Sequence, residues 1–321
     1  MKKIEALKSY FEDYLESQTF PDDPEHLYDS MRYILSLGGK RLRPIAVLLV
    51  ADAFNKLDDN ALHAALAVEH FHNFSLIHDD IMDASNLRRG KPTVHKKYDT
   101  NTAILSGDGL LIKAYESLNR IEHNKTEILN LFNKTSIEVC EGQQMDMNFE
   151  SRDDVTIDEY INMIKLKTAV LIGCAFQLGG LVGNVSTENL LRLYQVGMNL
   201  GIAFQIMDDY LDAYSTQTGK KIGGDIIQNK KTALYLTALD RASEKQRKEL
   251  RHWYGADEFD EEKKVQSVLE IFKANKVDQA VHSIAQIYYQ EAQKNFDELV
   301  IPETGRARIQ EFFDLLKNRK F

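Results

Sequence analysis

The sequence is poor in cysteine and in long apolar runs. It has two cysteines among 321 residues, Cys140 and Cys174, and neither belongs to a Cys-x-x-Cys pair. This excludes a disulfide framework and zinc sites built from paired cysteines, and it is typical of a reducing compartment. Acidic residues interrupt the apolar positions near the N-terminus, and no apolar run reaches the roughly 18 residues of a membrane-spanning helix. We therefore expect a cytoplasmic protein without stable membrane insertion.

Positive charge is also in deficit. The chain has 40 lysines and arginines against 49 aspartates and glutamates, a formal net charge of −9. A surface built to attract nucleic acid would have the opposite balance, so we do not expect a nucleic-acid partner. Apolar residues make up 43% of the chain and charged residues 28%, which excludes a disordered protein.

Proline is scarce in a way that predicts the fold. All five prolines lie outside the stretch 93–301, and proline interrupts helices because it lacks an N–H group and clashes with the preceding turn. Apolar residues recur at spacings of three and four, first at Ile4, Leu7 and Phe11, and no sustained alternating strand pattern occurs. We predict an all-α fold with an N-terminal amphipathic helix and helices over about residues 42–55, 61–83, 103–121, 127–149, 157–181, 190–212, 233–242, 263–274 and 279–299.

These helices are predicted to form a single domain over residues 1–321. No internal repeat occurs, and no linker rich in proline, glycine or serine divides the chain. The segments 61–82 and 190–211 are apolar nearly all round, which is typical of central helices in a large bundle.

Both central segments end in the same acidic pattern, D-D-x-x-D. It is formed by Asp79, Asp80 and Asp83, and again by Asp208, Asp209 and Asp212. The first and fifth positions lie one turn apart on the same helix face, so a divalent cation would relieve the repulsion between their carboxylates. One such cluster is most often a solvated helix end. Two of them, each after a core-like helix, predict Mg²⁺ bound by carboxylates together with substrate phosphates.

Two basic segments supply the opposite charge. Residues 38–44 read GGKRLRP and residues 87–92 read LRRGKP. Arginine offers a planar fork to phosphate oxygens, lysine offers a point charge, and glycine allows a close approach. Either segment alone is most often a charged surface turn, but beside the aspartate clusters both favour a phosphate site. Further cations are Lys165, Lys167, Lys220, Lys221, Lys230 and Lys231.

The motifs in their order resemble those of a known family. GGKRLRP, SLIHDDIMDASNLRRGKPTVH, EGQQMD, KTA, FQIMDDYLD and TGKKIGGDIIQNKKT are similar to the motifs of trans-isoprenyl diphosphate synthases, the polyprenyl synthetase family. The resemblance covers residues 38–232 and implies an all-α bundle around a deep cavity, usually a homodimer. It implies a short-chain prenyltransferase that condenses isopentenyl diphosphate with dimethylallyl, geranyl or farnesyl diphosphate to a C15 or C20 product.

The same resemblance assigns roles to residues. Three Mg²⁺ ions would neutralise the leaving diphosphate, held by Asp79, Asp83 and Asp208 with support from Asp80, Asp209 and Asp212. Isopentenyl diphosphate, bound without metal, would contact Lys40, Arg43, His72 and Arg89. The allylic diphosphate would contact Arg88, Lys167, Thr168, Gln205, Lys220 and Lys230, and of these Lys167, Thr168 and Gln205 would also stabilise the allylic cation. Gln143 and Asp146 would line the cavity, whereas His70 and His78 are predicted to be structural.

The length of the prenyl product is predicted from one aromatic side chain. Phe74 stands five positions before the first aspartate motif, where family members form the floor of the tail pocket, and a large side chain there should stop elongation early. The first motif lacks the two-residue insertion of many bacterial short-chain enzymes. This combination resembles a type of geranylgeranyl synthase, and C15 and C20 products both remain open.

Two other functions remain as alternatives. A terpene cyclase also ionises an allylic diphosphate, but it normally has a different second metal motif. A non-catalytic partner subunit could share the fold, but it would be expected to have lost aspartates or basic residues, and this chain has lost none of them. The second D-D-x-x-D and the GGKRLRP segment favour the synthase.

Overall fold

The computed structural model describes residues 2–214, 223–256 and 258–317, and the described chain is all-α, as predicted. It consists of two compact units. The first comprises Met1–Lys134, Cys174–Tyr194 and Leu299–Phe313, and the second comprises Thr135–Gly173, Gln195–Glu298 and Asp314–Phe321. The prediction of a single domain stays a prediction.

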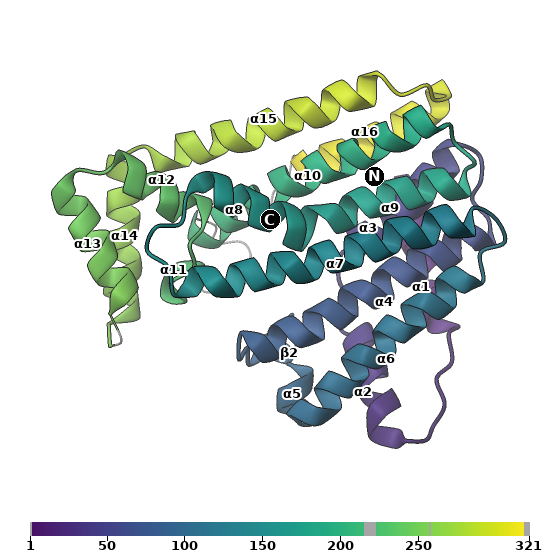
Figure 1. Cartoon of the computed structure of the whole chain (residues 1–321), viewed down its shortest axis with the longest axis horizontal. Helices are drawn as coiled ribbons and strands as arrows, with labels where there is room; N and C mark the ends of the chain where they lie inside the picture. The colour runs from purple at the N-terminus through teal and green to yellow at the C-terminus, as the bar shows by residue number, and fades with distance from the viewer. Residues whose placement is uncertain (1, 215–222, 257, 318–321) are drawn as a thin grey trace. The chain divides into compact units, whose positions relative to one another are not determined.

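The first unit is built around a long central helix. Its elements are α1 (Lys2–Glu16), α2 (Glu25–Ser36), α3 (Leu42–Ala53), α4 (Asp59–Met82), the antiparallel pair β1 (Leu87–Arg88) and β2 (Lys91–Pro92), α5 (Val94–Lys97) and α6 (Thr100–Asn119). Helix α4 packs along α6 and α3 (Figure 1). The approach to α6 is close, because a Cβ at Gly107 would overlap the ring of His78.

The chain passes between the units within four helices. Helices α7 (Lys125–Glu150), α9 (Val170–Val182) and α10 (Thr187–Tyr214) each contribute residues to both, and so does α16 (Glu303–Lys317) at the C-terminal end. The second unit also contains α8 (Ile157–Ile164), the π-helix η1 (Lys165–Ala169), α11 (Gly224–Ile227), α12 (Ala233–Arg241), α13 (Glu244–Gly255), α14 (Glu261–Ala274) and α15 (Val277–Asp297).

The second unit differs most from the sequence-based expectation at η1. We predicted one helix over 157–181, but five residues form a π-turn between α8 and α9. Glycines on two neighbouring helices make room for it. A Cβ at Gly142 on α7 would overlap the backbone of Lys167, and a Cβ at Gly201 on α10 would lie 2.7 Å from Cα of Ala169. A π-turn of this kind is common at functional sites.

Several elements were not predicted. Helices α2, α5, α11, α13 and α16 were missed. So was the two-residue strand pair, which is too short for a periodic pattern. The segment Ile157–Val182 is long and apolar enough to cross a membrane, although no such run was expected. Its most apolar window is 72% buried inside the protein, as in a core helix.

Candidate active site

A buried ion pair organises the first basic segment. Arg41 precedes α3 with a left-handed backbone (φ 51°), and its guanidinium donates to Glu69 on α4 and, over 2.7 Å, to the carbonyl of Leu35. The side chains of Arg41 and Glu69 are only 4% and 2% exposed. Asn73 donates to the Glu69 carboxylate over 3.0 Å. Arg41 is thus an internal anchor, whereas its neighbour Lys40 is exposed.

Three of the four residues predicted to hold isopentenyl diphosphate make contacts around this anchor. Nη1 of Arg43 lies 3.2 Å from Nε2 of His72. Because arginine only donates, Nε2 must accept, so His72 is neutral with its proton on Nδ1. Burial and the neighbouring Arg43 lower the pKa of His72 well below its usual value. Arg89 donates to the carbonyl of Gly38, which joins the second basic segment to the first.

Several arginine side chains bring positive charge together in this part of the first unit. Burial lowers the pKa of Arg43 to about 10, and the nearby Arg89 adds to this effect. Cations gathered in a partly desolvated place repel one another, and a bound phosphate relieves this repulsion through bidentate hydrogen bonds.

The first aspartate motif divides into one buried and two outer carboxylates. Asp80 is 1% exposed, and both its oxygens accept from Arg88, from Nε over 2.8 Å and from Nη2 over 2.7 Å. Burial lowers the pKa of Arg88, but its bonds to Asp80 outweigh this effect and raise it. Asp79 is half-buried and Asp83 is exposed. These carboxylates stand at the C-terminal end of α4, where the helix dipole favours a cation.

Phe74 lies about four turns from the start of α4 and is half-buried. Its ring meets that of His78 edge-on at 4.8 Å and is tilted against that of Phe71 at 5.5 Å between centroids. It packs against a core cluster that includes Met31 and Ile77.

The second motif repeats the division in the other unit. Asp209 is buried, and its oxygens accept from the hydroxyl of Tyr160 over 2.6 Å and from Nε2 of Gln205 over 2.8 Å. Burial, and then the nearby Asp225, raises the pKa of Asp209 well above its usual value. Asp208 is exposed, and Asp212 accepts from the backbone N–H of Asp225 over 2.8 Å.

The π-turn presents two further predicted residues. Nζ of Lys167 donates to Asp146 of α7 over 2.6 Å, and Oγ1 of Thr168 donates to Oε1 of Gln205 over 3.3 Å. Gln143 is half-buried, one turn before Asp146 on α7. The π-turn, α7 and α10 thus assemble one polar group within the second unit.

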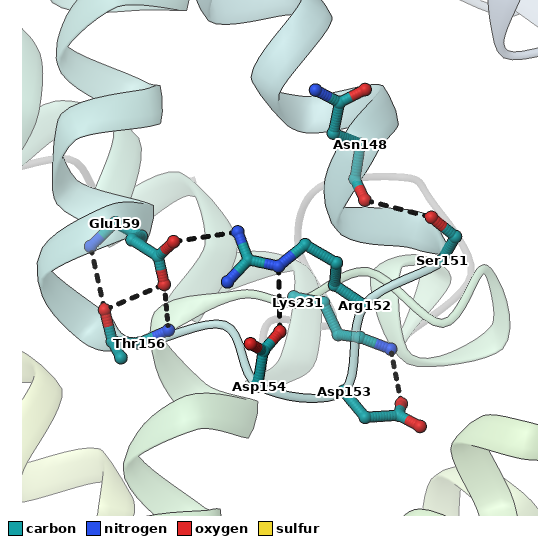
Figure 2. Close-up of polar contacts among 8 residues, drawn as sticks. All are labelled: Asn148, Ser151, Arg152, Asp153, Asp154, Thr156, Glu159 and Lys231. Carbon is teal, nitrogen blue, oxygen red and sulfur yellow. Dashed lines mark hydrogen bonds and ion pairs between the residues drawn. The ribbon is translucent and has the colours of Figure 1, made fainter.

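The segment after the second motif is held at two points. Lys230 pairs with Asp225 at 3.6 Å, and the preceding Asn229 accepts from the buried Lys264 of α14. Nζ of Lys231 lies 4.0 Å from a carboxylate oxygen of Asp153 in the α7–α8 loop (Figure 2). Lys220, which we predicted to contact the allylic diphosphate, lies outside the described residues.

The α7–α8 loop contains ion pairs of its own. Arg152 donates to Asp154 and to Glu159, each over 2.8 Å (Figure 2). Thr156 and Glu159 form a capping box that starts α8. The loop leads directly into α8, which carries Tyr160.

The donor set fits a hard divalent cation. Among the described residues no group of three or more histidines, cysteines, aspartates or glutamates is close enough to hold a metal by itself. Mg²⁺ does not need one, because it usually takes one or two carboxylates together with substrate phosphates and water. In each motif the outer carboxylates could serve in this way.

Sequence reasoning missed three of the residues that shape these groups. Nothing in the sequence pairs Glu69 with Arg41 or Tyr160 with Asp209, because each pair is far apart along the chain. Asp225 could have been noticed, since it stands inside the quoted TGKKIGGDIIQNKKT motif.

Comparisons with known proteins agree with this chemistry. The sequence model described as polyprenyl synthetase matches residues 24–272. A geranylgeranyl diphosphate synthase of Methanosarcina mazei is 43% identical over 68% of this chain and 69% of its own length. A geranylfarnesyl diphosphate synthase of Natronomonas pharaonis is 41% identical over 68% and 70%. A crystal structure of a geranylgeranyl pyrophosphate synthase superposes with a TM-score of 0.93 at 43% identity, covering 99% of both chains.

Proposed function

We propose that this chain, a prenyltransferase that belongs to the polyprenyl synthetase family, condenses isopentenyl diphosphate with allylic diphosphates to make geranylgeranyl diphosphate. One observation supports the proposal above the others. In each of the two D-D-x-x-D motifs the second carboxylate is buried and accepts hydrogen bonds from other side chains, whereas the first is more exposed and is proposed to bind a metal-bound substrate.

We assign the allylic diphosphate to the outer carboxylates. Asp79, Asp83, Asp208 and Asp212 would hold Mg²⁺, three ions in all, and Asp80 and Asp209 would support them from within. A cation held by these carboxylates would supply positive charge against the leaving diphosphate. Arg88, Lys167, Lys220 and Lys230 would add positive charge, which favours breaking the C–O bond.

Isopentenyl diphosphate would bind at the arginine-rich group of the first unit. Arg43 and Arg89 provide charge beside the exposed Lys40, and the neutral His72 donates from Nδ1. The double bond of this substrate forms a new C–C bond to the allylic cation. The resulting cation then loses a proton, which the released diphosphate accepts, so the chain needs no basic histidine.

The allylic cation would be stabilised at the π-turn. Oε1 of Gln205 is held beside the hydroxyl of Thr168, and an amide oxygen and a hydroxyl oxygen both place partial negative charge near a carbocation. Lys167, tied to Asp146, would bind the departing diphosphate. Gln143 would line the same space.

Product length follows from Phe74. Its ring is already packed against Phe71 and His78, so it is rigid enough to end a growing chain. We propose C20 as the main product, in keeping with the named geranylgeranyl synthases among the relatives. Farnesyl diphosphate (C15) is the alternative.

We also propose a cytoplasmic homodimer. On α6 Leu105 and Ile112 are 60% and 61% exposed, and a spacing of seven places them on the same helix face. Two such faces from two copies would cover each other. Light scattering after chromatography should give twice the chain mass, and Leu105→Glu with Ile112→Glu should give one chain mass.

The decisive test is turnover. Purified protein is incubated with isopentenyl diphosphate and dimethylallyl, geranyl or farnesyl diphosphate, with and without Mg²⁺, and the dephosphorylated alcohols are analysed by mass. A metal-dependent C20 alcohol supports the proposal. A C15 alcohol corrects the product, a cyclic hydrocarbon indicates a terpene cyclase, and no turnover with any primer indicates a partner-dependent subunit.

A further inference from the structure

A buried tyrosine outside all the quoted motifs contacts the second aspartate motif. Tyr160 is 1% exposed, and its hydroxyl donates to Oδ2 of Asp209 over 2.6 Å. The other oxygen, Oδ1, accepts from Nε2 of Gln205 over 2.8 Å, and Oε1 of Gln205 accepts from Thr168 over 3.3 Å. These four side chains form one continuous hydrogen-bonded chain in the second unit.

This chain determines which way the Gln205 amide points. An ionised carboxylate only accepts hydrogen bonds, so when Asp209 is ionised Gln205 presents its NH₂ group to Oδ1 of Asp209 and its carbonyl oxygen to Thr168. The reversed amide would place its oxygen against the carboxylate and leave an NH₂ group facing Thr168. Only the observed orientation offers an electron-rich atom on the Thr168 side.

Tyr160 holds the carboxylate that imposes this orientation. Without its hydroxyl, Oδ2 would lose a buried donor and the Asp209 side chain could rotate about its χ2 bond. The position of Tyr160 is itself secured one turn earlier, where Thr156 and Glu159 form the capping box and Arg152 binds Glu159 (Figure 2).

We propose that Tyr160 is a positioning residue for catalysis, which acts through Asp209 to hold the Gln205 carbonyl oxygen toward the allylic cation. The proposal rests on the proposed function, since it needs an allylic cation beside Thr168 and Gln205. Tyr160 itself touches neither substrate.

The first experiment removes one oxygen atom. Tyr160→Phe should lower kcat about tenfold, which corresponds to a rise of about 1.4 kcal/mol in the activation free energy, because the carboxylate that orients Gln205 loses one of its buried donors. The KM of each diphosphate should stay within twofold, since the groups that bind the diphosphates are unchanged. Calorimetric binding of inorganic diphosphate with Mg²⁺ should also match the wild type.

A matched control separates this effect from loss of a buried hydroxyl in general. Tyr235 is also buried in the second unit, where its ring stacks on Tyr254 at 3.8 Å. Tyr235→Phe should leave kcat within twofold. Thermal unfolding without metal should show both single variants folded at the assay temperature.

A double-mutant comparison tests whether Tyr160 acts through Asp209. Asp209→Asn lets the new amide donate to a reversed Gln205, so kcat should fall further than in Tyr160→Phe. Adding Tyr160→Phe to Asp209→Asn should change kcat by less than twofold. The proposal would be overturned by an unchanged kcat in Tyr160→Phe, or by a change in Tyr160→Phe that affects KM alone. It would also be overturned if the fall in kcat of the double variant equalled the product of the two single-variant falls. A wild-type protein that forms no prenyl product would instead refute the proposed function.

Discussion

Replacing Glu69 by alanine should destabilise the first unit more than any replacement of a surface residue. The side chains of Glu69 and Arg41 are 2% and 4% exposed, so the variant leaves a buried guanidinium without its carboxylate. Removing one partner of a buried ion pair costs about 3–5 kcal/mol. Arg41 keeps its hydrogen bond to the carbonyl of Leu35, and Asn73 keeps one to the carbonyl of residue 69, which favours the lower end of that range.

The same change should affect one substrate more than the other. Arg41 stands between Lys40 and Arg43, so a displaced Arg41 would move both proposed ligands of isopentenyl diphosphate. The KM for isopentenyl diphosphate should rise at least tenfold, and the KM for the allylic substrate should change much less. This split is expected because both neighbours of Arg41 are proposed ligands of isopentenyl diphosphate, whereas the allylic substrate is also bound by the π-turn and the second motif, which belong to the other unit.

Urea unfolding followed by circular dichroism measures the loss of stability. Initial rates at varied substrate concentrations give the two KM values. Glu12→Ala is the control, because the Lys8–Glu12 pair is 3.7 Å long with side chains 38% and 37% exposed. Exposed pairs contribute about 0–1 kcal/mol. A loss below about 1 kcal/mol for Glu69→Ala, or one equal to that of Glu12→Ala, would refute the assigned role of the ion pair.

Five further substitutions test the proposed site and the stability of the fold. Asp79→Ala or Asp208→Ala should reduce turnover at least a hundredfold with an unchanged unfolding midpoint; near-normal kinetics would contradict the metal assignment. Phe74→Ala should lengthen the products seen by mass analysis, and an unchanged distribution would remove Phe74 from the pocket floor. Burial lowers the pKa of His70 to about 4, below the unfolded value of about 6.5, so the free energy of unfolding should fall as pH drops from about 6.5 to 4. In thermal unfolding measured across pH, His70→Leu should make this fall less steep. An equally steep fall in His70→Leu would contradict the role given to His70. Gly142→Ala should cost about 1–3 kcal/mol in urea unfolding, because its Cβ overlaps the π-turn backbone, and wild-type stability would show that the turn has room.

The helices and the family could both be predicted from the sequence, because each is recognised from short stretches of the chain. The absence of proline between residues 93 and 301 and the three-to-four spacing of apolar residues act within single helices. The boundaries of α4 and α10 therefore fall within a few residues of those predicted. The quoted motifs predicted the polyprenyl synthetase family, and the comparisons confirm it.

Which aspartate of each D-D-x-x-D motif is buried could not be predicted in this way. Both motifs look alike in sequence, yet Asp80 is held by Arg88, eight positions away, and Asp209 by Tyr160, 49 positions away. The π-turn likewise needs the absence of a side chain at Gly142 on another helix. Periodicity along the chain determined which residues are helical and which carboxylates share a face. Only tertiary packing decided which of those carboxylates became buried anchors, because the donors that satisfy them come from distant parts of the chain.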